Sequence, residues 1–231
     1  MEQILQRGIR AGRRLTLKLS TRPVSRHALV GRPHLWAMKR RFQFEFLISR
    51  GLKPEQRLLD IGCGTLRGGI PVIEYLQPGH YVGIEAREDV LEEGRRELGE
   101  AGLQDKLPLL IHSTDLAQVK LADPVQLAWA FSVLIHMSDE ILDACLGMVT
   151  RALADDGEFY ANVVLGTRPE GHWQGFPVVA RDRDFYEAAA ASHGLVVNEV
   201  GTLESLGHKT GTSQDQGTML RFIRATATRS S

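Results

Sequence analysis

The stretch from Leu58 to Gly69 reads LLDIGCGTLRGG and places four glycines within eight positions, directly after a short apolar run. Glycine adopts backbone angles that a side chain forbids, so such a turn lets a ligand lie against the main chain at the start of a helix. A phosphate-binding loop would end in lysine followed by serine or threonine, and this turn contains no lysine. A dinucleotide-binding loop would carry glycine at its sixth position, where Arg67 stands. Both ligands are disfavoured, and a purely structural turn is the remaining alternative.

Two acids near this turn indicate the charge of a ligand. Asp60 precedes Gly62 by two residues, where a carboxylate would repel the pyrophosphate of NAD but would attract an ammonium and a sulfonium centre. Glu85 ends a second apolar run, 21 residues beyond Gly64, a spacing that suits an acid binding ribose hydroxyls. Together the two acids favour a sulfonium methyl donor over a dinucleotide.

The hydrophobic pattern predicts strands that alternate with helices, which is typical of a parallel α/β sheet. We expect strands at 57–62, 81–86, 107–112, 125–134 and 157–165, and helices at 36–48, 67–76, 88–103, 139–153 and 182–194. The last two strands, 195–205 and 218–226, have no helical pattern between them and should form an antiparallel pair at the sheet edge. Residues 166–180 are rich in glycine and proline, so we expect a loop there.

With these features on one chain, the sequence resembles the class I S-adenosylmethionine-dependent methyltransferases. LLDIGCGT looks like their first motif, YVGIEA like their second, and the terminal strand pair like their last hairpin. The resemblance implies a seven-stranded, Rossmann-like methyltransferase sheet, mostly parallel with the last strand antiparallel, and helices on both faces. It divides the chain into a basic N-terminal arm at 1–30, a helical lid at 31–53 and an S-adenosylmethionine-binding domain at 54–231.

The resemblance also implies a set of cofactor contacts. These are Asp60, Gly62, Cys63 and Gly64 around the methionine part, Glu85, Ala86, Arg87 and Asp115 around the ribose and adenine, and Phe131 and Ser132 beside the methyl group. The loop departs from the family pattern at Leu66, which stands where a third glycine is expected. Asp115 has an alternative role, because a single acid after a strand often caps a helix.

Methyl transfer is a direct displacement, so the protein must hold the acceptor in line and remove a proton when the acceptor is a hydroxyl. His136, after the fourth strand, is the candidate base, and a structural imidazole is the alternative. Arg168, His172 and Trp173 are expected to close over the acceptor, unless their loop merely packs on the surface. We interpret His208 as part of a polar connection between the last two strands.

The acceptor class follows from motifs that are absent. AFSV stands after the fourth strand in place of an NPPY-type sequence, which argues against methylation of adenine, cytosine or glutamine amino groups. An acidic triad for a magnesium site is not evident, so no metal is expected. We therefore expect a small-molecule acceptor with an oxygen or nitrogen nucleophile. The alternatives are an RNA methyltransferase that uses the basic arm, and a non-catalytic interaction module that keeps the cofactor fold.

The charge of the chain is strongly asymmetric. Residues 1–41 hold eleven basic residues and one acid, a net charge of +10, and the remaining residues hold 17 basic and 27 acidic residues, a net charge of −10. The arm could contact RNA phosphates or, through residues 1–20, a membrane surface, but pairing with the acidic body is favoured. Two cysteines without a disulfide pattern indicate a reduced, cytoplasmic chain, and no apolar run predicts a transmembrane segment. Nothing in the sequence specifies an oligomeric state.

Overall fold

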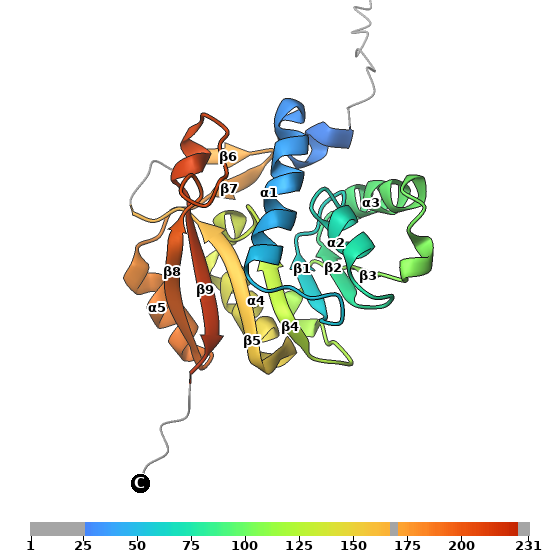
Figure 1. Cartoon of the computed structure of the whole chain (residues 1–231). Helices are drawn as coiled ribbons and strands as arrows, with labels where there is room; N and C mark the ends of the chain where they lie inside the picture. The colour runs from blue at the N-terminus through green and yellow to red at the C-terminus, as the bar shows by residue number, and fades with distance from the viewer. Residues whose placement is uncertain (1–25, 167–170, 226–231) are drawn as a thin grey trace, which may run out of the picture.

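A single seven-stranded sheet forms the centre of the molecule in a computed structural model that describes residues 26–166 and 171–225 (Figure 1). The strand order is β3-β2-β1-β4-β5-β9-β8, and β9 runs antiparallel to both of its neighbours while the other strands run parallel. The strands are β1 Leu58–Ile61, β2 Tyr81–Glu85, β3 Leu109–His112, β4 Val125–Ala130, β5 Leu153–Val163, β8 Leu195–Thr202 and β9 Thr218–Arg224. The expected Rossmann-like methyltransferase sheet, with its last strand antiparallel, is confirmed.

Helices cover both faces of the sheet, because the central strands are apolar on both sides. The helices are α1 Trp36–Ser49, α2 Gly69–Tyr75, α3 Glu88–Glu100, α4 Asp139–Ala152 and α5 Arg183–Ser192. One buried cluster joins the sheet to α4 and α5, and a second joins it to α1, α2 and α3. Within the described ranges, no helix combines the length and apolarity needed to cross a membrane.

The chain between β5 and α5 differs from the expected loop. It forms a separate hairpin of β6 Gly171–Trp173 and β7 Phe176–Val178. Gln174 and Gly175, between the two strands, have φ angles of +51° and +85°. Two successive left-handed residues make the kind of tight turn that matches strand twist, so the glycine that suggested a loop instead closes a hairpin.

Two predicted strand boundaries also shift. β4 ends at Ala130, four residues earlier than expected, because Ser132 turns with a φ of +59°. The backbone N–H of Ser132 donates to Oδ1 of Asn162 at 2.6 Å, which fixes this turn against the end of β5. β5 begins at Leu153, directly after α4, and its first residue pairs with Val125 before a bulge.

Helix α1 packs into the core of the domain, although it belongs to the segment expected to be a lid. The ring of Phe46 lies 5.2 Å from that of Trp129 on β4 and 5.4 Å from that of Tyr160 on β5. Phe42 packs on Phe131 at 5.5 Å between ring centroids. A helix anchored by such contacts contributes to the stability of the sheet itself.

Replacing Phe46 by alanine should therefore lower the free energy of unfolding by about 3–5 kcal/mol, as is usual for a fully buried phenylalanine. Ile48→Ala, at a side chain 36% exposed on the same helix, should cost less than about 1 kcal/mol. Denaturant titration followed by circular dichroism measures both. A wild-type midpoint for Phe46→Ala would mean that α1 is a detachable lid.

Candidate functional site

A cavity of about 460 Å³ opens at the carboxyl edge of the sheet, where parallel α/β sheets bind their ligands. Its walls come from the loops after β1, β2, β3 and β4, from α1, from the β6–β7 hairpin and from the connection between β8 and β9. The predicted residues that line it are Asp60, Gly62, Cys63, Gly64, Glu85, Ala86, Arg87, Phe131, Ser132, His136 and Trp173. The fold thus brings together predicted residues from the ends of β1, β2 and β4 and from the β6–β7 hairpin.

The glycine loop after β1 needs its glycines. Gly62 and Gly64 have φ angles of +69° and +60°, the left-handed region that disfavours side chains. A Cβ atom on Gly62 would overlap the side chain of Val133, and one on Gly64 would lie 2.9 Å from Cγ1 of Val30. Leu66 also adopts a left-handed φ of +57° with its side chain fully buried, so leucine fills the place of the expected third glycine.

Asp60 is a buried acid between two neighbouring strands. Its Oδ2 accepts a hydrogen bond from Oη of Tyr81 at 2.6 Å. The pKa of Asp60 is raised to about 7, chiefly by burial; the hydrogen bond from Tyr81 opposes this rise and the nearby Glu85 adds to it. The carboxylate is therefore costly to ionise until a cation lies beside it.

Glu85 links the two loops that follow β1 and β2. Its Oε2 accepts the backbone N–H of Gly64 at 2.9 Å, and its Oε1 accepts the backbone N–H of Arg87 at 3.0 Å. Nε of Arg87 lies 3.4 Å from the same Oε1. A carboxylate has about four acceptor positions, so Glu85 retains capacity for a further donor such as a hydroxyl.

Arg87 lies under the β6–β7 hairpin. Its guanidinium stands 6.0 Å from the ring of Trp173 and 5.6 Å from that of Phe176, within the range of a cation–π contact. Trp173 faces the cavity as predicted, whereas His172 is exposed and does not line it. Arg168 falls outside the described residues.

His136 lines the cavity beside this hairpin. Its Nδ1 lies 2.7 Å from the carbonyl oxygen of Pro177, and its ring stacks on Trp173 at 5.5 Å. A carbonyl only accepts, so Nδ1 carries the proton and Nε2 has the free lone pair. Burial lowers the pKa of His136, and the positive charge of Arg87 lowers it as well. A neutral imidazole fits both a base and a structural role, so the catalytic role stays a prediction.

Asp115 is not placed in the cavity lining. Its Oδ1 accepts the backbone N–H of Ala117 at 3.0 Å and so caps the short 3₁₀ helix Leu116–Gln118. This position agrees with the alternative expectation that Asp115 caps a helix. The neighbouring Ser113 and Thr114 line the cavity instead. Cys63 lines the cavity as a neutral thiol, because burial raises its pKa.

Six lining residues with basic, imidazole or amide side chains were not predicted as site residues. They are Lys39 and Gln43 on α1, Arg67 after the glycine loop, Asn162 at the end of β5, and His208 and Gln214 between β8 and β9. His208 lies on the connection between β8 and β9, as expected, but its side chain is only 1% exposed and lines the cavity. Arg67 was visible only as a departure from the dinucleotide pattern.

The N-terminal strap, residues 26–31, closes the cavity above the glycine loop. Val30 and Gly31 line the cavity, and the carbonyl of Val30 accepts from Nη1 of Arg67 at 2.6 Å. Nε2 of Gln174 donates to the carbonyl of Ala28 at 2.8 Å, which joins the strap to the hairpin turn. The strap therefore connects the first loop of the site to the β6–β7 hairpin.

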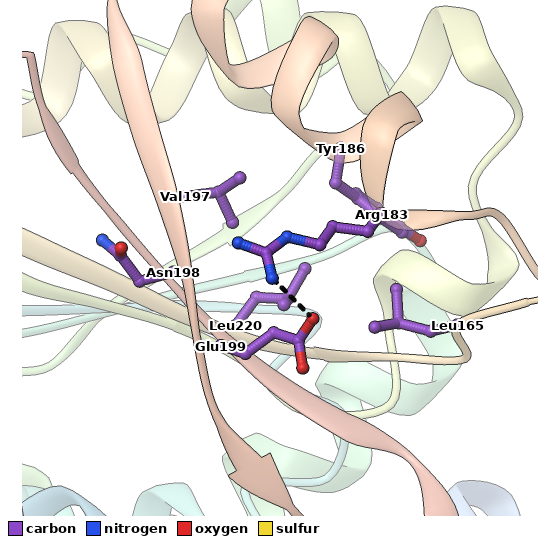
Figure 2. A pocket seen from close by; sticks show the side chains of 7 residues that line it. All are labelled: Leu165, Arg183, Tyr186, Val197, Asn198, Glu199 and Leu220. Atoms are coloured by element: carbon purple, nitrogen blue, oxygen red, sulfur yellow. Dashed lines mark hydrogen bonds and ion pairs between the residues drawn. The ribbon is translucent and has the colours of Figure 1, made fainter.

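A second hollow, between α5, β8 and β9, does not qualify as a binding site. Figure 2 shows the ion pair of Arg183 with Glu199, at 3.5 Å, among the side chains that form it. Its walls leave no interior volume for a water molecule.

Comparison with known proteins identifies the domain. Residues 59–159 match a family model described as a methyltransferase domain. Residues 59–159 therefore carry a methyltransferase domain, and the sheet around them has the fold of S-adenosylmethionine-dependent methyltransferases. Solved structures that share this fold hold S-adenosylmethionine or S-adenosylhomocysteine. No curated protein matches the sequence.

Solved structures share the methyltransferase fold at low sequence identity. Magnesium protoporphyrin IX methyltransferase from Synechocystis PCC 6803, with bound S-adenosylmethionine, is 17% identical over 82% of this chain and 79% of that chain, with a TM-score of 0.60. The glycopeptide N-methyltransferase MtfA is 14% identical over 82% and 90%, with a TM-score of 0.60. An S-adenosylmethionine-dependent methyltransferase from Clostridium acetobutylicum ATCC 824 is 12% identical over 80% and 90%, with a TM-score of 0.61. Since the acceptors named for these proteins differ, the fold does not determine the acceptor.

The buried Asp60 of the methyltransferase gives a pH-dependent prediction. Its pKa of about 7 in the folded chain exceeds the ordinary value of 3.8, so the folded state holds a proton that the unfolded state releases. Stability without cofactor should therefore fall as pH rises from about 4 to 7. Asp60→Asn cannot ionise, so at pH 8 its free energy of unfolding should exceed that of the wild type by about 1 kcal/mol or more, which corresponds to about 2–4 °C in Tm. At pH 5 the difference in the free energy of unfolding should be smaller. Thermal melts at the two pH values measure this, and an equal difference at both would contradict it.

Proposed function

We propose that this methyltransferase transfers the methyl group of S-adenosylmethionine to an oxygen or nitrogen atom of a small-molecule acceptor. The observation that carries the proposal is a cavity at the carboxyl edge of the sheet, with Asp60 and Glu85 beside a glycine loop whose Gly62 and Gly64 have no room for side chains. A buried acid of raised pKa suits an ammonium group, and a carboxylate with a free acceptor position suits ribose hydroxyls.

The residues of the cavity suggest how the cofactor would be held. Asp60 and the backbone of Gly62, Cys63 and Gly64 would bind the methionine part, and Glu85 the ribose. Ala86 and Arg87 would border the adenine, and Phe131 and Ser132 would lie beside the methyl group. When bound, the cofactor supplies an already activated methyl group, so the protein's main task is to orient the acceptor and exclude water.

The elements that cover part of the cavity support a small acceptor. The strap, α1 and the β6–β7 hairpin, including Trp173, close over the strand ends. The RNA alternative depends on the basic arm, of which residues 1–25 lie outside the described ranges. Arg26 is occupied by acids of α3, at 3.2 Å from Glu93, 3.2 Å from Glu97 and 2.5 Å from Glu100. These pairs support the favoured role of the arm, which is contact with the acidic body.

The two free, buried cysteines support a reducing compartment such as the cytoplasm.

Calorimetric titration with S-adenosylhomocysteine tests the cofactor site, with NAD as the competing ligand. Glu85→Gln keeps an oxygen for the N–H of Gly64 but loses the charge, so the affinity should fall about 10- to 100-fold. Glu92→Gln, at an exposed acid of α3, is the matched control and should bind like wild type. Wild-type affinity in Glu85→Gln, or tighter binding of NAD, would contradict the assignment.

An acceptor screen tests the substrate class. Formation of S-adenosylhomocysteine should be stimulated by small hydroxyl or amine compounds and not by RNA. Stimulation by RNA, lost at high salt, would favour the RNA alternative. Tight cofactor binding without turnover on any acceptor would favour the non-catalytic interaction module.

A further inference from the structure

The cavity has a polar end far along the sheet from Glu85 and Arg87. We name it the acceptor end and define it by Lys39, Phe131, Asn162, His208 and Gln214. These residues lie on α1, directly after β4, near the end of β5 and on the connection between β8 and β9, whereas Glu85 ends β2 on the other side of β1. Lys39 is 5% exposed and His208 is 1% exposed, so these two side chains are shielded from solvent, whereas Gln214 at the rim is exposed.

Asp215 fixes His208 in one orientation. Its Oδ1 lies 3.0 Å from Nδ1 of the imidazole. The same carboxylate accepts from the backbone N–H of Thr210 at 2.9 Å, the hydroxyl of Thr210 at 2.8 Å and the backbone N–H of Gly211 at 2.8 Å. Burial alone would raise the pKa of Asp215, but these hydrogen bonds outweigh it and lower that pKa. An ionised Asp215 places the imidazole proton on Nδ1 and leaves a lone pair on Nε2.

That lone pair has no partner within the part of the chain that the structure describes. Nε2 of His208 is buried without a hydrogen bond. Burial lowers the pKa of His208 to about 4, and the positive charge of Lys39 contributes, so the ring is neutral at pH 7. Phe42 and Phe131 contact the ring edge-on at 5.0 and 5.4 Å between centroids, which restricts its rotation. Buried polar atoms are normally satisfied, so the free Nε2 points to a ligand that donates a hydrogen bond.

Two cations face the same end without a carboxylate in contact. Nζ of Lys39 donates to Oε1 of Gln214 at 2.6 Å. Burial lowers the pKa of Lys39 to about 8, and the neighbouring Arg67 contributes to this change. Among the described residues, no ion pair includes Lys39 or Arg67, and Asp60 acts on Arg67 only at longer range. Uncompensated positive charge favours negative charge that develops on a ligand.

We propose that the acceptor end binds a phenol-class hydroxyl, with His208 as the base, Asp215 as its positioning residue and Lys39 as the stabiliser of the oxygen. This rests on the proposed function. The acceptor oxygen bonds to the methyl carbon and releases its proton to Nε2 of His208, while the sulfur keeps the electron pair of the broken carbon–sulfur bond. The imidazolium that forms is paired with Asp215.

A phenol fits the acidity that this base requires. The hydroxyl proton becomes strongly acidic as the oxygen bonds to the methyl carbon, so a neutral imidazole can accept it at that point, and a phenol, which ionises near pH 10, begins as a stronger acid than an alcohol. An alcohol is a much weaker acid, and a carboxylic acid is already ionised and needs no base. The charged and titratable groups that act on His208 are Lys39 from α1, Arg67 from the glycine loop and Asp215 from its own connection.

Nuclear magnetic resonance of the full chain, labelled with ¹⁵N-histidine and saturated with S-adenosylhomocysteine, tests binding with phenol as the probe. We expect His208 to carry its proton on Nδ1, and phenol to shift the Nε2 resonance as it donates a hydrogen bond. A proton on Nε2, no shift with phenol, or a shift confined to His136 would overturn the proposal.

Turnover on phenol-class acceptors tests catalysis. His208→Gln should lower kcat about 100-fold or more with unchanged affinity for S-adenosylhomocysteine, and added imidazole should restore part of the rate in His208→Ala. Asp215→Asn should lower kcat about tenfold. The matched control is a second histidine–aspartate pair away from the cavity. His193, at the end of α5, lies 2.7 Å from Asp143 on α4, and His193→Gln and Asp143→Asn should leave kcat unchanged.

The outcomes separate this proposal from the proposed function. If S-adenosylhomocysteine fails to bind, the proposed function fails, whereas the histidine resonances of the unliganded chain still report on phenol. Turnover that persists in His208→Gln but is lost in His136→Gln would keep the function and overturn the assignment of the base.

Discussion

The carboxylate of Glu85 holds the glycine loop against the end of β2, and the shape of the cavity depends on it. It accepts backbone N–H groups from Gly64 and Arg87, one on each side. The carbonyl of Ile84 adds bonds from Gly62 and Cys63 at 2.8 and 3.0 Å. Bonds to a buried charged group are stronger than bonds between neutral groups. The path of the loop is therefore set largely by β2, which explains how the loop keeps its course with Leu66 in a left-handed conformation.

The parts of the site that could be predicted from the sequence are those in which local pattern and chemistry coincide. Gly62 and Gly64 adopt the left-handed angles that only glycine takes readily, and Asp60 and Glu85 end adjacent apolar strands. The sheet followed from continuous apolar runs, which a parallel strand needs when helices cover both of its faces. The hairpin after β5 did not follow, because a tight turn of glycine and glutamine has the composition of an ordinary loop.

The acceptor end could not be predicted, because no local pattern distinguishes its residues. His208 lies among glycines and hydroxyl residues that are typical of a surface turn, and only the fold around Asp215 makes it buried. Lys39 lies on a helix whose apolar face predicts packing but not a cation in a cavity. Asp115 differs, since this acid caps a 3₁₀ helix through a residue two positions away, and its contact with the adenine stays a prediction. Burial and long-range pairing decide the positions of His208 and Lys39, whereas local geometry decides that of Asp115.

The contact between Lys39 and Gln214 joins residues 175 positions apart, and β9 pairs between β5 and β8. The two ends of the cavity can therefore form at different times during synthesis of the chain. The loops after β1 and β2 can come together once the first half of the chain has left the ribosome, because their contacts are short in sequence. The acceptor end cannot form until the connection before β9 has emerged. A nascent chain thus assembles the end that binds the cofactor before it can position an acceptor.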